Sequence, residues 1–413
     1  MKEVITTRTR ESIPEYGYLE DWVRLKVQGF IQGILEEEVE SLLGRSRYER
    51  REAVDAAKGW RNGYGKPRRI SLKTGTVTVS RPRVRGLEQR FESRILPLFR
   101  RRTREIGELL PELYLHGLAL GDFELALRGL LGEGAPLSAA SIQRLKTKWE
   151  VEYEGWRDED LSDLEPIYLW ADGVHVKAGL GKDKAALLVI VAAMRDGSKK
   201  VLSVESGYRE STTSWAAVLR SLKRRGFRPP LLVIADGNLG LWGALTDVWP
   251  DVREQRCWNH KITNVLDCFP KRVQPVASQY LRAIPYAETR GECERLKQQF
   301  IQRYEADYPK AVKTLERDWD RMVAFYDFPS EHWRHIRTTN VVESPFSAVR
   351  LRTGAARRFK KVANATALIW KVLMVTEKRF RKLNAPHLLS ELYEGIEYED
   401  GKRVPDQDGR AAA

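Results

Sequence analysis

The sequence has few cysteines, no long apolar run and no apolar segment at its start. Its three cysteines, Cys257, Cys268 and Cys293, are an odd number in a chain of 413 residues, so a disulfide framework is not expected. The longest uninterrupted apolar stretch, residues 185–194, is too short to span a bilayer. The first ten residues, MKEVITTRTR, lack the apolar segment of a signal peptide. We therefore expect a cytoplasmic protein with reduced thiols.

Positive charge is abundant and unevenly distributed. The formal net charge is +14 at pH 7. The chain of 413 residues is long enough for two or three domains, and its 42% of hydrophobic residues are enough for their cores. Residues 45–104 hold 19 Lys and Arg against 5 Asp and Glu, and residues 331–384 hold 13 against 3. The rest of the chain is therefore net acidic. Charged surfaces are often only solvated, but this segregation favours a nucleic acid as partner.

Two segments share one design, an apolar run that ends in Ala-Asp-Gly. Residues 166–173 read PIYLWADG, and residues 231–237 read LLVIADG. Continuous apolar runs are typical of strands that are covered on both faces, and such strands present ligand groups at their carboxyl ends. We therefore expect Asp172 and Asp236 to meet at one edge of a sheet.

The elements around these segments follow the order strand, strand, strand, helix, strand, helix, strand, helix. The turn Asp196-Gly197 between two apolar runs predicts a hairpin. Helices are expected over residues 211–225, 238–248 and 258–268, with a short strand near Val252. This order resembles the ribonuclease-H-like fold, an α/β fold with a mixed sheet whose first and fourth strands carry neighbouring catalytic aspartates. From residue 271 to about 330 only helical spacing remains, which predicts an all-helical insertion.

The first 155 residues are expected to form a mainly helical DNA-binding region with a basic hairpin. Residues 18–43 have the spacing of an amphipathic helix, which suits a packing or dimer face. Apolar residues alternate around Thr74-Gly75, as in a hairpin, and arginines flank it. Three short helices over residues 104–149 are compatible with a helix-turn-helix, or with a plain helical bundle.

A third acid, Glu343, lies before an apolar and basic helix, where it is either an ion-pair partner or a metal ligand. If the fold brings Asp172, Asp236 and Glu343 together, their oxygens form a site that suits Mg²⁺, with Mn²⁺ as a substitute. Two such ions can clamp the attacking and leaving oxygens in phosphoryl transfer. Bound cations would also reverse the local charge, so that a DNA phosphate could approach.

Four motifs in order make the family resemblance specific. They are YLWADGVHVK, VIADGNLGLWGAL, REQRCWNHKITNVL and RTTNVVESPFSAVRLRTGAARRF. Together they resemble the Mutator-type transposases of bacterial insertion sequences, over residues 22–389. By this resemblance Asp172, Asp236 and Glu343 match the catalytic triad, and Cys257 and His260 match a Cys-x-x-His signature.

The resemblance implies a transposase that binds terminal inverted repeats and performs metal-dependent strand cleavage and transfer into target DNA. Because two ends must be held together, a homodimer or larger assembly is expected, associated with the nucleoid when bound. The catalytic core is expected over residues 156–270 and 331–390, with the insertion at 271–330 and a disordered tail at 391–413. The basic side chains expected to contact DNA are Arg61, Lys66, Arg68, Arg69, Arg81, Arg83, Arg85, Arg144, Lys146, Arg350, Arg352, Arg357 and Arg358.

Cys257 and His260 lie three residues apart at the start of a predicted helix, where both can face the acids. Three interpretations stay open. The pair can act beside the triad, with His260 contacting the scissile or a neighbouring phosphate and Cys257 packing beneath it. It can be a buried thiol and a hydrogen-bonded histidine, or it can bind structural zinc with His332 and His335. An alternative function for the whole chain is a DNA-binding regulator that no longer cuts.

Overall fold

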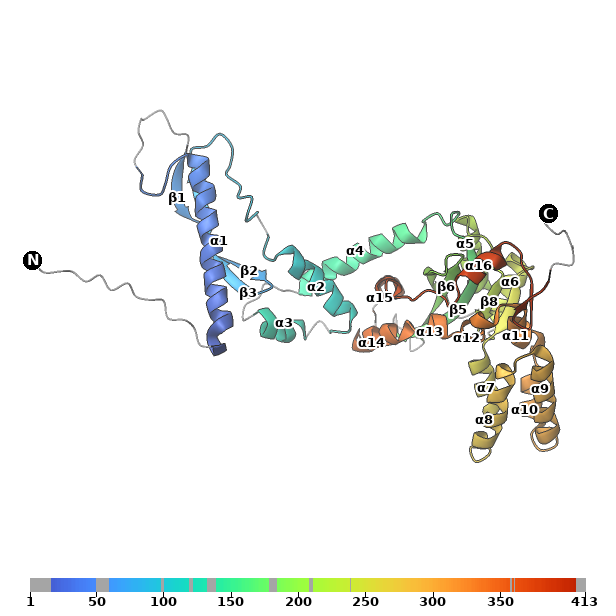
Figure 1. Ribbon diagram of the computed structural model, residues 1–413. Coiled ribbons are helices and arrows are strands. Elements are labelled where there is room, and N and C mark those ends of the chain that lie inside the picture. Colours follow the sequence, from blue (N-terminus) through green and yellow to red (C-terminus); the bar gives the residue numbers. More distant parts are fainter. Residues whose placement is uncertain are drawn as a thin grey trace, which may run out of the picture. The chain divides into compact units, whose positions relative to one another are not determined.

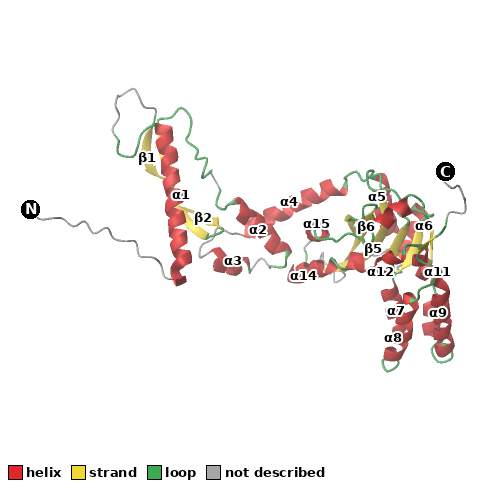
Figure 2. Cartoon of the chain, viewed as in Figure 1, coloured by secondary structure: helices red, strands yellow, loops and turns green. Residues whose placement is uncertain are grey.

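The structure is a computed structural model that describes residues 16–49, 59–97, 100–118, 122–131, 139–177, 184–207, 211–237, 239–356, 359 and 361–405 (Figures 1 and 2). The chain divides into two compact units, Met1–Leu145 and Lys146–Ala413. The expected boundary near residue 155 falls inside a continuous helix, α4 (Ala139–Arg157), which begins in the first unit and ends in the second. No helix in the described ranges is both long enough and apolar enough to cross a membrane.

The first unit is organised around one long helix, α1 (Leu19–Leu43). This helix ends at Gly44, whose φ of 62° is the left-handed conformation that glycine adopts without strain. Leu35 packs against β2 (Arg68–Leu72) and β3 (Gly75–Val79), an antiparallel pair in which Ile70 faces Val77. A second pair joins β1 (Trp60–Tyr64) to β4 (Pro82–Arg85). Helices α2 (Arg104–Leu115) and α3 (Phe123–Leu131) follow.

The second unit contains a five-stranded mixed sheet with the order β7-β6-β5-β8-β9. Its strands are β5 (Pro166–Lys177), β6 (Lys184–Met194), β7 (Lys199–Gly207), β8 (Leu232–Ala235) and β9 (Arg253–Arg256). The strand β6 is antiparallel to β5 and β7, whereas β5, β8 and β9 are mutually parallel. The first and fourth strands of this unit are therefore neighbours, as in the ribonuclease-H-like fold that the element order predicts.

Helices cover both faces of the sheet, which explains why its strands are apolar on both sides. On one face α5 (Thr212–Arg224) and α6 (Leu239–Val248) pack against side chains such as Leu169 and Val233. The Ser211 hydroxyl caps α5 by accepting from the Ser214 N–H at 3.2 Å. On the other face Tyr168 contacts the rings of Phe328 and His332.

After β9, the chain continues through five α-helices, of which the first four extend away from the sheet and the last packs against β9 (Figure 1). They are α7 (Trp258–Leu266), α8 (Gln274–Ala283), α9 (Arg290–Tyr304), α10 (Pro309–Glu316) and α11 (Trp319–Val323). A cluster of aromatic rings, including Phe269, Phe300 and Tyr304, fixes α9 in this group. The buried Lys261 ammonium donates to the Thr314 carbonyl at 2.8 Å and to the Arg317 carbonyl, so it ties α7 to the end of α10.

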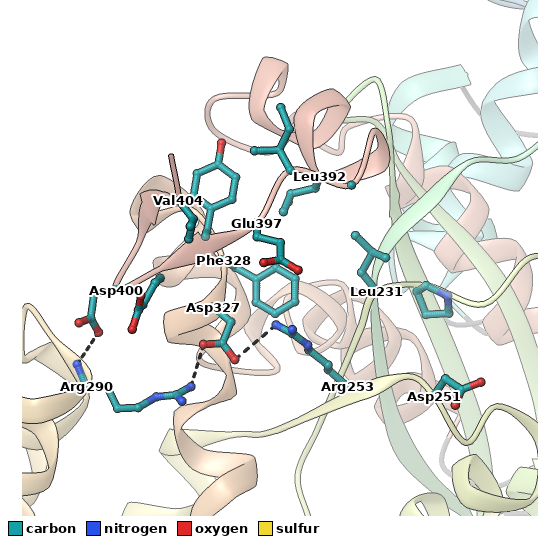
Figure 3. A pocket seen from close by; sticks show the side chains of 15 residues that line it. Leu231, Asp251, Arg253, Arg290, Asp327, Phe328, Leu392, Glu397, Asp400 and Val404 are labelled. Carbon is teal, nitrogen blue, oxygen red and sulfur yellow. Dashed lines mark hydrogen bonds and ion pairs between the residues drawn. The ribbon is translucent and has the colours of Figure 1, made fainter. Parts of the chain in front are cut away.

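The chain then returns to the sheet through α12 (Trp333–Ile336), α13 (Asn340–Glu343), α14 (Phe346–Ala356), α15 (Val362–Glu377) and α16 (His387–Tyr393). The disordered tail expected from residue 391 does not hold for residues 391–405. There β10 (Tyr398–Glu399) and β11 (Lys402–Arg403) form a hairpin, and the Tyr398 hydroxyl donates to Glu391 at 2.6 Å. The hairpin borders a pocket of about 560 Å³, in which Arg253 and Arg290 both pair with Asp327 (Figure 3).

Candidate active site

Asp172 and Asp236 occupy equivalent positions on two neighbouring parallel strands. Ala171 of β5 lies opposite Ala235 of β8, and each aspartate is the next residue. The expectation that Asp172 ends its strand is incorrect, because β5 continues to Lys177, opposite Lys184 of β6. What ends at Asp172 is the parallel ladder with β8. The two carboxylates are therefore adjacent in register even though only β8 stops there.

The glycine of the second Ala-Asp-Gly motif has a specific steric role. Gly237 has a φ of +100°, and a Cβ at this position would lie 2.2 Å from Nε of Arg256. The same guanidinium donates to the Asp236 carbonyl at 3.3 Å and pairs with Asp318 at 2.9 Å. Only glycine leaves room for this buried arginine, which fixes the backbone that carries Asp236.

Glu343 is the last residue of the short helix α13, and a buried threonine positions its side chain. The Thr339 hydroxyl donates to the Glu343 carboxylate and lies 3.2 Å from Sγ of Cys257. The Thr339 backbone N–H also donates to that sulfur at 3.3 Å. Cys257 and Thr339 are both fully buried. The thiol therefore lies beneath the turn that presents Glu343.

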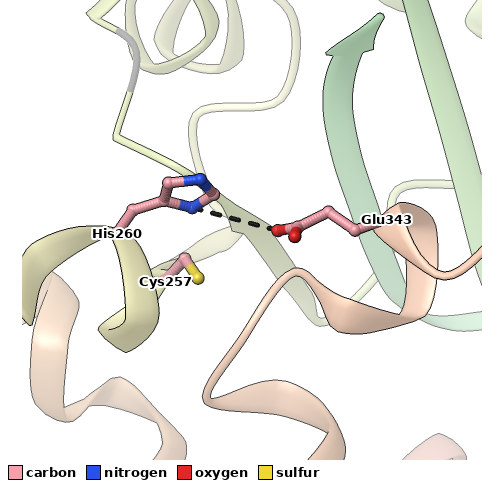
Figure 4. A group of neighbouring side chains, drawn as sticks. All are labelled: Cys257, His260 and Glu343. Carbon is pink, nitrogen blue, oxygen red and sulfur yellow. Dashed lines mark ion pairs between the residues drawn. The ribbon is translucent and has the colours of Figure 1, made fainter. Parts of the chain in front are cut away.

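His260 faces the same carboxylate from the first turn of α7. Its Nδ1 lies 3.9 Å from Oε1 of Glu343, and 41% of its side chain is exposed (Figure 4). The ligand atoms of Cys257, His260 and Glu343 all lie within 4.8 Å of one another. The pKa of His260 is raised to about 9 by its hydrogen bond to Cys257 and by the negative charges of Glu343 and Asp236.

The pKa of Asp172 links the aspartates to this cluster. It is raised to about 7, first by burial and then by the charges of Asp236 and Glu343, while His260 opposes the shift. The negative charges of Asp236 and Glu343 therefore both act on the Asp172 carboxylate. The donor atoms of the three acids are all oxygens, the ligands that Mg²⁺ and Mn²⁺ prefer. The residues present therefore fit divalent metal ions.

The structure does not form the four-residue zinc site. Within the described ranges, the one cluster of three or more metal-ligating side chains is Cys257, His260 and Glu343. His332 is buried elsewhere, where its Nδ1 accepts from the Tyr168 hydroxyl at 2.9 Å and its Nε2 donates to the Ala385 carbonyl at 3.2 Å. His335 lies on α12 and is not part of the cluster.

The arginines expected to contact DNA differ in how accessible they are. Arg61 pairs with Glu36 at 2.7 Å and Glu40 at 3.2 Å, and Arg68 donates to the Pro97 carbonyl at 3.3 Å. Arg352 is only 2% exposed, so it does not reach a phosphate from this position. Arg357 and Arg358 lie outside the described residues. Arg81 and Lys146 are partly buried, and the exposed members of the set are Lys66, Arg69, Arg83, Arg85, Arg144 and Arg350.

Three residues around the site were not singled out from the sequence. Thr339 supports Glu343, Arg256 supports Asp236, and Asn340 accepts from the Asn259 side-chain amide at 3.3 Å. Thr339 and Asn340 lie in the motif RTTNVVE, so their proximity to Glu343 in the sequence was the available signal. The Arg256 contact depends on strand pairing between β8 and β9, which the local sequence does not reveal.

Comparison with known proteins assigns the chain to a family. The model of the family described as "Transposase, Mutator family" matches residues 2–382. The transposase of insertion sequence element IS6120 from Mycolicibacterium smegmatis is 42% identical over 297 residues, which is 72% of this chain and 92% of that protein. The transposase of IST2 from Acidithiobacillus ferrooxidans is 39% identical over 279 residues, 67% of this chain and 94% of that protein.

Among solved structures, the chain is similar to the integrase catalytic core domain of HTLV-2 in complex with magnesium. That likeness has 19% sequence identity and a TM-score of 0.18, and it covers 37% of this chain and 87% of the other. A TM-score this low supports no inference about the site. The sequence relatives are sufficient, and the resemblance in the four motifs is confirmed: the chain belongs to the Mutator family of transposases.

Proposed function

We propose that the protein binds the terminal inverted repeats of an insertion sequence and catalyses metal-dependent cleavage and strand transfer of double-stranded DNA. The proposal is supported by the matched register of Asp172 and Asp236 and by the charge effect of Asp236 and Glu343 on Asp172. Two of these acids follow a registered pair in neighbouring strands, and the third is coupled to them through the raised pKa of Asp172. Neighbouring carboxylates repel one another, and a bound cation would relieve that repulsion.

Asp172, Asp236 and Glu343 would hold Mg²⁺, or Mn²⁺ as a substitute. When bound, such ions supply charge neutralisation and Lewis-acid activation at a phosphodiester. The chain's own residues position the reacting groups. Thr339 and Cys257 hold Glu343, Arg256 holds the backbone at Asp236, and His260 presents an imidazole at the exposed side, where it can contact the scissile or a neighbouring phosphate.

The remaining parts of the chain serve DNA binding and assembly in this proposal. The basic first unit contacts the inverted repeat through its exposed arginines, and Arg350 holds the strand near Glu343. Helices α7 to α11 form a helical insertion in the catalytic core and carry Cys257 and His260 at its base. Cleavage at two element ends requires at least a homodimer. The 3′-hydroxyl released by the first step attacks target DNA in the second.

The test is strand cleavage of DNA that carries the host element's own ends, in Mg²⁺ or Mn²⁺. Asp172→Asn, Asp236→Asn and Glu343→Gln should each abolish cleavage and strand transfer, because each removes a metal ligand. Binding to the repeat should stay within about threefold of wild type, because no core side chain is lost. Asp247→Asn, on an exposed position of α6, is the matched control and should cleave normally.

Three results would contradict the proposal. Retained cleavage in any one variant would remove that residue from the site. Loss of repeat binding in all three would assign the acids a structural role. A wild-type protein that binds the repeat but never cuts it, with either metal, would favour the DNA-binding regulator.

A further inference from the structure

A second pocket lies beside the candidate active site and has an unusual lining. It has a volume of about 460 Å³ and is bordered by α7, the end of α8 and residues 334–340. Pockets of roughly 300–1,000 Å³ are typical of small-molecule sites. Among the described residues that line it, the charged side chains are Arg282, Arg334 and Arg337, and none is a carboxylate. The pocket therefore suits an anion.

The pocket and the candidate active site share two structural elements. Asn259 in the lining immediately precedes His260 on α7, and Asn340 begins α13, which ends at Glu343. The two asparagines are hydrogen-bonded to each other at 3.3 Å. A DNA strand that crosses the three acids therefore needs to extend only slightly to reach the pocket.

The lining also contains an aromatic ring that is presented for stacking. Tyr286 is 73% exposed. The guanidinium of Arg337 lies 4.4 Å from the centre of its ring and is fixed by donating to the Trp333 carbonyl at 3.2 Å and to the Pro285 carbonyl. One face of the ring is thus supported. An exposed, supported tyrosine beside cations is the arrangement that single-stranded nucleic acid binders use for one base and its phosphate.

The other two arginines are available for a phosphate. Arg282 and Arg334 are both exposed, and neither forms an ion pair with another described residue. In addition, the Thr338 hydroxyl is buried without a hydrogen-bond partner among the described residues. Unsatisfied buried hydroxyls are unfavourable, so this one points to a polar ligand group in the pocket.

We propose that this pocket holds one unpaired nucleotide of the DNA strand that passes over the three acids. The base stacks on Tyr286, and the adjoining phosphate is bound by Arg282 and Arg334. This inference rests on the proposed function, because it assumes that DNA lies at the acids. A base cannot stay paired in the duplex while it stacks on the ring, so the nucleotide must be extrahelical while it is bound.

The experiment measures binding and cleavage of DNA carrying the element's own ends, in the full-length protein. A set of substrates is compared, and each has a single unpaired nucleotide at one of the three positions on either side of the cleavage point. An unpaired nucleotide at one position should tighten binding by wild type. Tyr286→Ala should weaken binding of that substrate by about 5- to 150-fold, which corresponds to the free energy of stacking one base on an aromatic ring. Tyr286→Phe keeps the ring and should restore it.

The arginine variants test the phosphate contact separately. The double variant Arg282→Ala/Arg334→Ala should lose the same gain, and its binding should depend less steeply on salt, by roughly 0.7 per lost contact in the log–log slope. Tyr280→Ala and Arg272→Ala alter partly or fully exposed side chains in or just before α8, outside the pocket, and should behave as wild type. A gain that survives both Tyr286→Ala and the double arginine variant would overturn the proposal.

Two further arms separate the alternatives. A deoxynucleoside monophosphate alone should bind at least a hundredfold more weakly than the strand, and equal affinity would overturn the proposal in favour of a site for free nucleotides. Asp172→Asn should keep the gain from the unpaired nucleotide while losing cleavage. If Asp172→Asn still cleaves, the proposed function fails. The pocket is tested separately, and it is still supported if Tyr286→Ala loses the gain in binding that the unpaired nucleotide gives.

Discussion

At the scale of single residues, the two Ala-Asp-Gly motifs look identical in the sequence but differ in the structure. Gly173 lies inside β5, where its N–H donates to Asp172 at 2.7 Å. Gly237 follows β8 with a positive φ and leaves room for Arg256. The aspartates were predictable because each follows an apolar run. The different roles of the two glycines were not predictable, because they depend on whether the strand continues past its aspartate, as β5 does and β8 does not.

The first prediction concerns this second glycine. Gly237→Ala should reduce cleavage by at least about tenfold, because the new methyl group displaces the Arg256 guanidinium and strains a left-handed backbone. Folding should be weakened by about 1–3 kcal/mol. Cleavage kinetics and urea unfolding measure the two effects. Gly354→Ala, in α14 with open space around it, is the control. Normal cleavage by Gly237→Ala would show that Arg256 does not position Asp236.

The second prediction concerns the cysteine and histidine beside Glu343. His260→Ala should depress cleavage strongly with little loss of thermal stability, because the side chain is 41% exposed. Cys257→Ser should be milder in cleavage, since a hydroxyl can still accept from Thr339. Purified protein should carry no stoichiometric zinc, because His332 and His335 do not join the pair. One equivalent of tightly held zinc that is lost together with folding in either variant would reverse this interpretation.

At the scale of elements, the sheet was largely predictable and its edges were not. Apolar runs and the turn at Asp196-Gly197 identify β5 to β8, and Gly197 has the positive φ that this turn requires. The extension of β5 to Lys177 was not predicted, because the continuous apolar run ends at Ala171 and pairing with β6 carries the strand further, with only Val174 and Val176 buried beyond it. The β10–β11 hairpin was missed for a similar reason. Contacts distant in sequence hold it, including the hydrogen bond from Gly401 N–H to the Tyr326 carbonyl.

The third prediction concerns the docking of α12 and the residue before it on β5, which buries His332 and partly buries His335. Trp170 donates to the His335 carbonyl at 3.0 Å, and His332 bonds the Tyr168 hydroxyl. The pKa of His335 is lowered to about 4, mainly by burial and then by the charges of Lys199 and Arg334, and burial also lowers the pKa of His332. Both values lie below the unfolded value of about 6.5. Stability is therefore fully present above about pH 6.5 and is lost as the pH falls toward 4.

Thermal unfolding at pH 7.5 and pH 5.0 measures this effect. Wild type should unfold at a lower temperature at pH 5.0, and His335→Gln should show a smaller difference between the two values. His116→Gln, at an exposed position in the first unit, should show the same difference as wild type. An equal loss in all three proteins would mean that other groups govern the acid sensitivity.

At the scale of the whole molecule, the basic zones and the residues of the candidate site are distributed unevenly along the chain. The strongly basic residues 45–104 belong to the first unit, which has its own core around Leu35, Val77 and Leu96. The three acids, His260 and the second basic zone belong to the second unit. The sequence alone indicated this division through its charge pattern. It did not reveal which arginines are exposed, because Arg61 and Arg68 are engaged by partners distant in sequence.

The last prediction follows from this segregation. Binding of the terminal repeat should weaken steeply with salt, with log K falling by roughly 0.9 per phosphate contact for each log unit of salt. Arg83→Ala/Arg85→Ala removes two exposed charges and should flatten that slope by about 2, whereas Arg61→Ala should not, because Arg61 is paired with Glu36 and Glu40.

Arg350→Ala, near Glu343, should reduce cleavage more than initial binding. A fragment of residues 1–155 should still bind the repeat at low salt, and a fragment that shows no binding would move repeat recognition to the second unit.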